Sequence, residues 1–527
     1  MINQKKNYYF FLLIIIFLYG IYCSINIGKS WDTFHFVNIG KERLSYLLQL
    51  GTNSSTEENF SSLAYPAIYN TLSAFILMIF PIKFELEIFH LTNFLISFLT
   101  SIGVYKFTKK LLNQKIAIYT FFIFITFPIF FGHMSINDRD TIIVFSNIWI
   151  AFYTLQYLKL NKEKNKKYIF YFGFLLALGA GVRFAFVVTL IPIILYAFYV
   201  IFNSNNKIKF ITISYDVTKI IFISLIIILL FWTPTHENLF IKPYQLIKQT
   251  FGYPIGYPFI FLNGNVFQSG QIPNSYILQN LFFKSPEYML FSYLIFFLIV
   301  FKIKFFCSKI INQFNLKIIF IIFTILFSNI LLIFNPYPVY DGLRLFIFIL
   351  PYFSIIPAIV LFFLINNLNK KSNKILLIIF AILNLNYIYV FSMLTPYHYT
   401  YLNLFAGNFS KVNKKFENDY WGTSLKELID KIKTNSAINL KSNLRLSLCG
   451  VGKGSVKYYL KRKKITNYQI VSASKNPDFI ILANRVLMDY DKENSSKIIT
   501  CFDKYKGINI EEVKRNGLIL SALKKVN

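Results

Sequence analysis

The feature that most constrains this chain is a succession of apolar runs, each close to the length of about 20 residues that a helix needs to cross a bilayer. Only 15% of the residues are charged, against roughly a quarter in soluble domains, which excludes an ordinary cytosolic enzyme. We therefore expect a multi-pass α-helical membrane protein. The runs cover residues 8–27, 86–107, 116–131, 141–160, 168–182, 184–202, 210–232, 288–303, 318–334, 345–365 and 375–394.

One further apolar segment, residues 63–82, decides the topology, and Pro66 interrupts it. If it lies in the outer interface without crossing, every lysine cluster falls on the cytoplasmic side. If it crosses, the first two clusters move outside, which violates the tendency of lysines to lie on the cytoplasmic side of a membrane protein. Its amphipathic, aromatic start also suits an interfacial helix. We predict about eleven spans in the cell (inner) membrane, with a cytoplasmic N-terminus and a periplasmic tail. The lysine clusters lie in residues 106–115, 162–167, 207–209, 302–309 and 370–374.

The first run could also be a signal peptide. It is long, however, and no small-x-small cleavage site follows it, so we interpret residues 8–27 as a retained span.

The positions of the acidic residues are independent of the lysine distribution on which this topology rests. Before residue 395, all of them except Glu163 and Asp216 fall on the outer side. The positive-inside rule depends little on acids, so this segregation is separate information. It predicts that ligand binding or chemistry takes place outside the membrane.

The net charge of +31 does not indicate a nucleic-acid partner, because the basic residues lie between apolar runs and not on one polar face. The four cysteines have no CxxC or histidine-linked spacing. We therefore predict neither a disulfide framework nor a zinc site.

The expected soluble parts are the outer segments 28–62, 132–140 and 233–287 and a tail over residues 395–527. The transmembrane domain is expected over residues 1–394. In the tail, DYWGTSLKELIDKIK has a helical pattern, and LRLSLCG, YQIVSA, DFIILA and LILSAL are typical of short buried strands. This predicts a small extracytoplasmic α/β domain. GVGKGS lacks the full spacing of a phosphate-binding loop, so we do not interpret it as one.

Two acidic sites stand out in the outer loops. Asp32 follows Trp31 just after the first span, and its simplest interpretation is a solvated interfacial carboxylate. GHMSINDRDTIIVF places Asp138, Arg139 and Asp140 between the third and fourth spans. These three residues are either a solvated turn with Asp140 as the N-cap of the next helix, or one wall of a pocket.

Two arginines lie at the ends of apolar runs, where a charge is costly unless it is paired or lines a polar path. Arg183 interrupts GAGVRFAF, and Arg344 follows Asp341 in NPYPVYDGLRLF. A structural salt bridge between Asp341 and Arg344 is one interpretation. The other is a phosphate clamp, because guanidinium groups bind phosphate oxygens in a bidentate manner.

A divalent metal is not supported by the sequence. His35 and His133 have no tight ligand spacing with Asp32 or Asp140, and we predict no metal site.

The order of these parts resembles the GT-C glycosyltransferases. More narrowly, it is similar to the family 39 and dolichyl-phosphate-mannose protein mannosyltransferase-like group, which includes the bacterial aminoarabinose transferases of lipid A. GHMSINDRD is similar to the GHSFINPKD-type loop of bacterial members, and TPYHYTYLNLFAG followed by FENDYWGTSLKE resembles their HPYQYVYFN…DYWG segment. The resemblance covers most of the chain in layout, and the DYWG region is its most specific motif.

The resemblance implies a role for each matching position. Asp32 corresponds to the first-loop acid that serves as catalytic base, although Thr33 stands where many relatives carry a second acid. Asp140 corresponds to the acid of the second outer loop. Arg139 stands where relatives often have lysine, and Arg344, with Arg183, fits the basic residues that hold the lipid phosphate.

The resemblance also implies a donor, a polyprenyl-phosphate-linked sugar, and an inverting transfer to a glycan, lipid or protein acceptor. Membrane lipids are the other expected partners. Two alternatives stay open at this point. One is a transporter or flippase of lipid-linked glycans, for which Asp216, with Lys219 nearby, is the clearest intramembrane acid. The other is a glycan polymerase or ligase.

Overall fold

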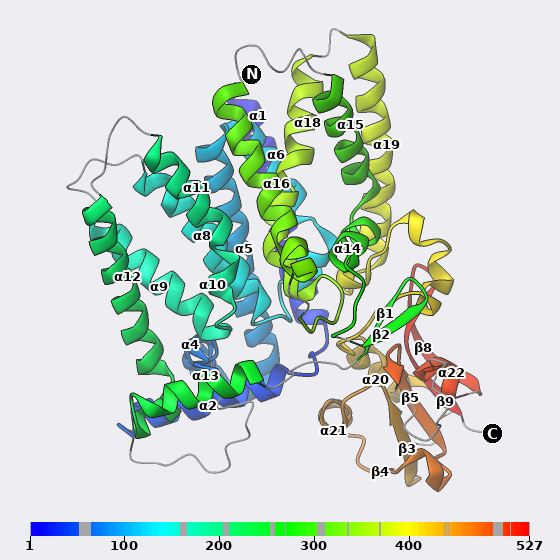
Figure 1. Cartoon of the computed structure of the whole chain (residues 1–527). Coiled ribbons are helices and arrows are strands. Elements are labelled where there is room, and N and C mark those ends of the chain that lie inside the picture. Colours follow the sequence, from blue (N-terminus) through cyan, green and yellow to red (C-terminus); the bar gives the residue numbers. More distant parts are fainter. Residues whose placement is uncertain are drawn as a thin grey trace.

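The computed structural model describes residues 2–51, 65–158, 166–203, 210–252, 259–268, 270–302, 311–334, 337–367, 370–436, 438, 440, 442–487, 499–505 and 507–525. It shows a helical bundle with a small sheet domain at one end (Figure 1).

Each predicted apolar run has a helical counterpart in the bundle. Within the described part of the chain, six helices are long and apolar enough to cross a membrane, or up to seven if α14 and α15, which are bent by 117°, form one span. The count of about eleven spans therefore stays a prediction. The helices are α1 (Ile2–Asn26), α5 (Glu85–Leu111), α6 (Gln114–Ile125), α7 (Pro128–His133), α8 (Asp140–Tyr157), α9 (Lys166–Val182), α10 (Phe186–Thr189), α11 (Ile191–Phe202), α12 (Phe210–Phe231), α14 (Tyr276–Lys284), α15 (Glu287–Lys302), α16 (Ile311–Phe334), α17 (Leu350–Phe353), α18 (Ile355–Asn366) and α19 (Lys371–Met393).

Prolines break three of the predicted runs. Pro128 begins α7 after the break that ends α6, Pro192 lies in the first turn of α11, and Pro351 lies in the first turn of α17. Proline lacks a backbone N–H, so it is tolerated in the first turn of a helix but not in its interior. The uninterrupted apolar runs of the sequence thus become pairs of shorter helices.

The segment that decides the topology forms α4 (Ile68–Leu77), a helix of 10 residues. At 1.5 Å per residue it rises about 15 Å, half of the apolar thickness of a bilayer. It packs beside α2 (Thr33–Leu48), which lies across the end of the bundle together with α13 (Ile241–Gly252) (Figure 1). A helix of this length does not cross a bilayer by itself, and the interfacial placement of the segment stays a prediction.

The C-terminal domain contains a five-stranded sheet of order β4-β3-β5-β9-β8. β3 (Leu444–Cys449) pairs in parallel with β4 (Tyr468–Ile470) and β5 (Phe479–Ala483), and β9 (Leu518–Lys525) is antiparallel to β5 and β8 (Ile508–Arg515). The strand predictions are confirmed, and α20 (Leu425–Thr434) confirms the predicted helix. β8 was not predicted, because the charged residues in INIEEVKR hide its alternation.

The prediction of no disulfide is wrong, because Cys449 and Cys501 form one across 52 residues of sequence. Cys449 ends β3, and Cys501 begins α22 (Cys501–Lys504), which packs beside β5, the neighbour of β3. The sheet brings the two residues together, so their spacing along the chain gave no signal.

Two short strand pairs lie outside the main sheet. β1 (Phe259–Leu262) and β2 (Asn265–Gln268) form a hairpin in the outer segment 233–287, and β6 (Val486–Leu487) pairs with β7 (Ile499–Thr500).

Asp216 accepts a hydrogen bond from the Tyr157 hydroxyl at 2.7 Å, so its partner is not Lys219. The short 3-10 helices are η1 (Ile82–Phe84), η3 (Thr233–Glu237), η4 (Arg344–Ile349), η5 (His398–Thr400), η6 (Leu404–Ala406), η7 (Phe409–Lys414) and η8 (Ala473–Lys475).

The C-terminal domain docks on the first outer loop. A Cβ added to Gly28 would lie 2.2 Å from the carbonyl oxygen of Thr423, so only glycine permits this approach. The backbone N–H of Lys29 donates to the Tyr459 hydroxyl at 2.7 Å, on helix α21 (Lys453–Arg462). The loop that carries Asp32 is therefore held between the bundle and the domain.

Candidate active site

The first outer loop turns sharply after α1 and presents Asp32 at the start of α2. The Ser30 backbone N–H donates to Thr33 Oγ1 at 3.0 Å, and the two hydroxyls are 2.9 Å apart. This turn fixes the backbone on both sides of Asp32. The Asp32 side chain remains 45% exposed.

The second outer loop forms a rigid turn around Asn137. Its Oδ1 accepts from the backbone N–H groups of Arg139 (3.3 Å) and Asp140 (2.9 Å), and its Nδ2 donates to Asp140 Oδ2 at 3.0 Å. Asp138 points elsewhere and accepts a hydrogen bond from Asn70 Nδ2 of α4 at 2.6 Å. Asp140 is the first residue of α8 and not its N-cap, so the N-cap interpretation does not hold.

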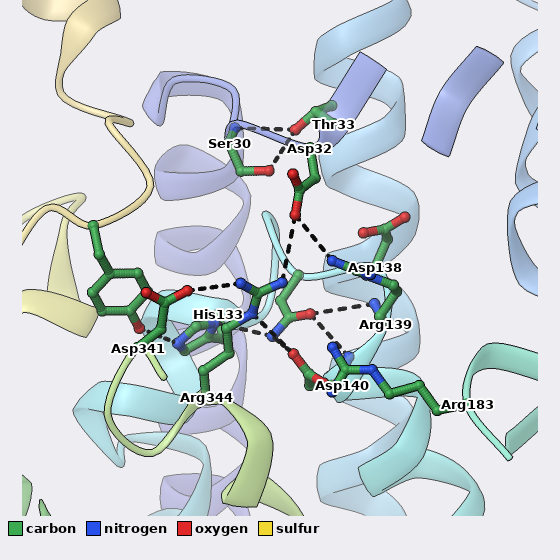
Figure 2. A network of polar contacts seen from close by, with 12 residues as sticks. Ser30, Asp32, Thr33, His133, Asp138, Arg139, Asp140, Arg183, Asp341 and Arg344 are labelled. Atoms are coloured by element: carbon green, nitrogen blue, oxygen red, sulfur yellow. Dashed lines mark hydrogen bonds and ion pairs between the residues drawn. The ribbon is translucent and has the colours of Figure 1, made fainter. Parts of the chain in front are cut away.

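Arg344 joins the carboxylates of three loops into one ion-pair network (Figure 2). Its guanidinium lies 2.8 Å from Asp341, 3.2 Å from Asp140 and 3.6 Å from Asp32. The Asp341 salt bridge that the sequence suggested is therefore present, as one contact among three.

The other two predicted arginines complete this network. Arg139 lies 2.9 Å from Asp32, and Arg183 lies 3.0 Å from Asp140 (Figure 2). All seven residues predicted for the site are thus brought together: six belong to the ion-pair network, and Asp138 lies at its edge, linked to α4.

The C-terminal domain contributes a residue that the sequence did not reveal. Arg485 follows β5 and lies 3.5 Å from Asp341, and its guanidinium also donates to the backbone carbonyl of Tyr420. The guanidinium carbon of Arg485 also lies 5.8 Å from the centre of the Trp31 indole ring. In sequence it is one basic residue among many in the tail, and only the fold shows that the domain forms part of the site.

The DYWG motif, residues 419–422, builds the wall under the network. Asp419 accepts hydrogen bonds from the backbone N–H groups of Thr423 and Ser424 at 2.9 and 3.0 Å. The Tyr420 hydroxyl bonds to His133 Nε2 at 2.8 Å, and Trp421 lies 4.5 Å below the Arg344 guanidinium. The most specific motif of the sequence is therefore a structural part of the site.

The charges of the network determine the protonation state of Asp32, the exposed carboxylate. Partial burial raises the pKa of Asp32, but Arg139 and Arg344 outweigh this effect and hold it below the ordinary value for aspartate. For Asp138 burial wins over Arg139 and Asn70, and its pKa is raised. Asp32 is therefore ionised at neutral pH.

Lys29 adds a cation that the sequence analysis missed. It is buried, and its ammonium lies 4.3 Å above the Phe34 ring, with no ion pair to any described residue. Burial lowers the pKa of Lys29 to about 8, although Asp32 opposes the shift. The site contains four aspartates and four arginines, whose charges balance in number. Lys29 therefore adds one positive charge beyond this balance, close to Asp32.

Among the described residues, no three His, Cys, Asp or Glu side chains are placed to hold a metal ion. His133 bonds to Tyr420. The absence of a metal stays a prediction.

Comparisons with known proteins place the fold. Residues 66–232 match the family model of the dolichyl-phosphate-mannose-protein mannosyltransferases. The archaeal oligosaccharyltransferase AglB from Archaeoglobus fulgidus, solved with an inhibitory peptide and a dolichol-phosphate, is similar in structure, with a TM-score of 0.50 and 12% identity. That match covers 90% of this chain and 61% of AglB, so the chain corresponds to about three fifths of AglB.

ArnT from Cupriavidus metallidurans is also similar, with a TM-score of 0.48 and 11% identity over 81% of this chain and 69% of ArnT. No curated protein is significantly similar in sequence. The likeness to AglB concerns the fold, which is the GT-C fold that the family resemblance implied.

Proposed function

We propose that this chain is an integral-membrane glycosyltransferase that moves a sugar from a polyprenyl-phosphate donor to an acceptor hydroxyl. The GT-C fold and the match of residues 66–232 to a mannosyltransferase model support this class of reaction. A dolichol-phosphate is present in the AglB complex of the same fold, which supports a lipid-phosphate donor here. The many apolar helices would let the lipid chain lie within the membrane.

One observation carries the assignment of the base. Asp32 is 45% exposed, whereas Asp140 and Asp341 are each 2% exposed and their carboxylates are engaged by arginines. Of the acids in the network, only Asp32 has a carboxylate that an incoming acceptor can reach. Asp32 is therefore the general base of the proposed reaction.

The reaction is a single displacement. The acceptor hydroxyl oxygen attacks the anomeric carbon, its proton passes to Asp32, and the bond from the anomeric carbon to the phosphate oxygen breaks. The phosphate leaves with the bonding electrons as polyprenyl phosphate, and Asp32 then releases the proton to water. Because phosphate is a good leaving group, no general acid is needed, and one displacement inverts the anomeric carbon.

The arginines stabilise the leaving phosphate. Arg139 and Arg344 both lie beside the Asp32 carboxylate, at 2.9 and 3.6 Å. A phosphate that arrives next to Asp32 would meet both guanidinium groups and the positive charge of Lys29. Such fixed charges stabilise the negative charge that develops on a leaving group.

Asp140 and Asp341 have a positioning role in this proposal. Asp140 holds Arg183 and Arg344, and Asp341 holds Arg344 and Arg485. Without these carboxylates the long arginine side chains would have more than one low-energy arrangement.

The disulfide supports an outer location for the site. Disulfides persist in oxidising compartments and are rare in the cytosol. The Cys449–Cys501 bridge lies in the domain that contributes Arg485, and this domain, α2 and α13 lie at the same end of the bundle (Figure 1). We place that end outside the cytoplasm.

The proposal is tested with the detergent-purified chain, a panel of polyprenyl-phosphate sugars and an envelope extract as acceptor source. We expect release of polyprenyl phosphate from at least one donor, with inversion in the glycoside formed, and Asp32→Asn should lower the rate about 10²- to 10⁴-fold. Retention of configuration contradicts the single displacement. A transporter would release no polyprenyl phosphate, and its transport would survive Asp32→Asn.

A further inference from the structure

A small pocket lies against the ion-pair network, because Gly342, the neighbour of Asp341, and Tyr420 of the DYWG motif both line it. Its lining residues come from α14, from β1 and from the segment just before the DYWG motif. Its polar lining consists of Tyr276, Asn280, Lys284, Glu417 and Tyr420, and its apolar lining comes mainly from β1. It has room for about one water-sized group.

Lys284 is the unusual member of this lining. The residue is only 4% exposed, yet its ammonium forms no hydrogen bond and no ion pair with any part of the chain that the structure describes. The centre of the Tyr420 ring lies 6.0 Å from this ammonium. Glu417 and Asp341 are the carboxylates that act on it electrostatically. Because this ammonium lines the pocket and has no hydrogen-bond acceptor among the described residues, an acceptor atom of a ligand in the pocket would satisfy it.

The pocket shares its wall with the proposed site. Gly342 lines it, and a Cβ on Gly342 would lie 3.2 Å from Lys284 Nζ. Gly342 directly follows Asp341, which holds Arg344 at 2.8 Å. Tyr420, which also lines the pocket, bonds to His133 beneath the network.

The polar groups of the lining decide what fits. Lys284 can only donate hydrogen bonds, whereas the carboxylate of Glu417 accepts them. A hydroxyl group both donates and accepts and is water-sized. A carboxylate would face Glu417, and an acetamido group is too large for the space.

From this geometry we infer that the pocket is a specificity subsite, in which Lys284 and Glu417 bind a single hydroxyl substituent of the transferred sugar. The inference rests on the proposed function and adds to it the class of donor: a sugar with a free hydroxyl at one particular ring position. Donors that are deoxy, acetamido or carboxylate at this position are disfavoured.

The test uses the detergent-purified full chain and polyprenyl-phosphate hexoses with their monodeoxy analogues. We expect the wild type to favour the hydroxyl over the deoxy donor at one ring position by about 10- to 100-fold in kcat/KM, because the deoxy sugar leaves Lys284 unsatisfied. Lys284→Met should remove the preference at that position and keep the preferences at the others. Lys242→Met is the matched control, because Lys242 pairs with Glu237 at 2.7 Å outside the pocket, and it should leave every preference unchanged.

Glu417→Gln is a second variant in case Lys284→Met does not fold, and it should weaken the same preference. If either folded variant keeps the wild-type preferences while transfer continues, the pocket only holds a water molecule and the inference is wrong. If the wild type transfers sugar from none of the donors, the proposed function fails, and the subsite fails with it.

Discussion

Arg344 is the residue on which the site depends most, and Arg344→Met tests this directly. Methionine is similar in length but carries no charge. The change removes contacts of 2.8 Å to Asp341 and 3.2 Å to Asp140, two carboxylates that are each 2% exposed. Removal of one partner of a buried ion pair costs about 3–5 kcal/mol in folding free energy.

The structure places the expected loss at the lower end of this range, because neither carboxylate is left alone. Asp140 keeps Arg183 at 3.0 Å, and Asp341 keeps Arg485 at 3.5 Å. We therefore expect a loss of about 3 kcal/mol. Transfer should also fall by about 10²- to 10³-fold, because a charge that stabilises the leaving phosphate is lost.

The assay is denaturant-induced unfolding in detergent micelles, followed by circular dichroism, with Arg462→Met as the control. Arg462 forms one ion pair with Glu87 at 2.5 Å and is 33% exposed, so its loss should cost about 1 kcal/mol or less. Adding Asp341→Asn to Arg344→Met should recover part of the stability, because it removes a buried carboxylate that has lost its closest cation and keeps only the longer contact to Arg485. The reasoning is refuted if Arg344→Met is as stable as Arg462→Met.

Four single features of the structure each give a further prediction. Gly132→Ala should abolish proper folding or activity, because its Cβ would lie 2.2 Å from the backbone nitrogen of Tyr399; normal thermal stability and transfer would contradict this packing. Replacing Cys449 and Cys501 by serine should cost up to about 4 kcal/mol by the chain-entropy relation for a loop of 52 residues, and wild-type protein from the outer compartment should show no labelling of these thiols without a reductant. Finally, because the pKa of Lys29 is about 8, its charge is present below that pH and lost above it, so KM for the anionic donor should rise above about pH 8. Lys29→Arg should remove this alkaline rise, and an unchanged rise in that variant would show that Lys29 is not its cause. The sign is opposite for Asp32, whose pKa lies below its ordinary value. Asp32 loses its ability to accept a proton only as the pH falls through that lowered pKa. The pH profile of transfer should therefore show no acid limb from Asp32 between about pH 5 and pH 8.

The sequence was sufficient for the parts of the molecule that depend on local pattern. The length of the apolar runs predicted the helices, and the alternation of short apolar segments predicted β3, β5 and β9. The residues predicted for the site also lie together, because acids and arginines at the outer ends of helices have few places other than the same face of a bundle. The family resemblance added the order of the loops and the DYWG motif.

What the sequence could not show depends on contacts between distant segments. Arg485 lies 141 positions after Arg344, and only the docking of the tail onto the first outer loop brings both to Asp341. The disulfide and the pocket lined by Lys284 arise in the same way, because each is formed by residues that are distant in sequence and that the fold brings together. Lys284 resembles any other lysine of this basic chain until its burial is known.

The most direct test of the central claim compares surface glycans and lipid-linked sugars by mass spectrometry in three strains: wild type, a deletion of this chain, and Asp32→Asn expressed at the wild-type level. We predict that the deletion loses one sugar from the surface, that its polyprenyl-phosphate form accumulates, and that Asp32→Asn gives the same result. If Asp32→Asn restores the sugar that the deletion loses, Asp32 is a surface carboxylate and not the base, and a transporter of lipid-linked glycans becomes the better account.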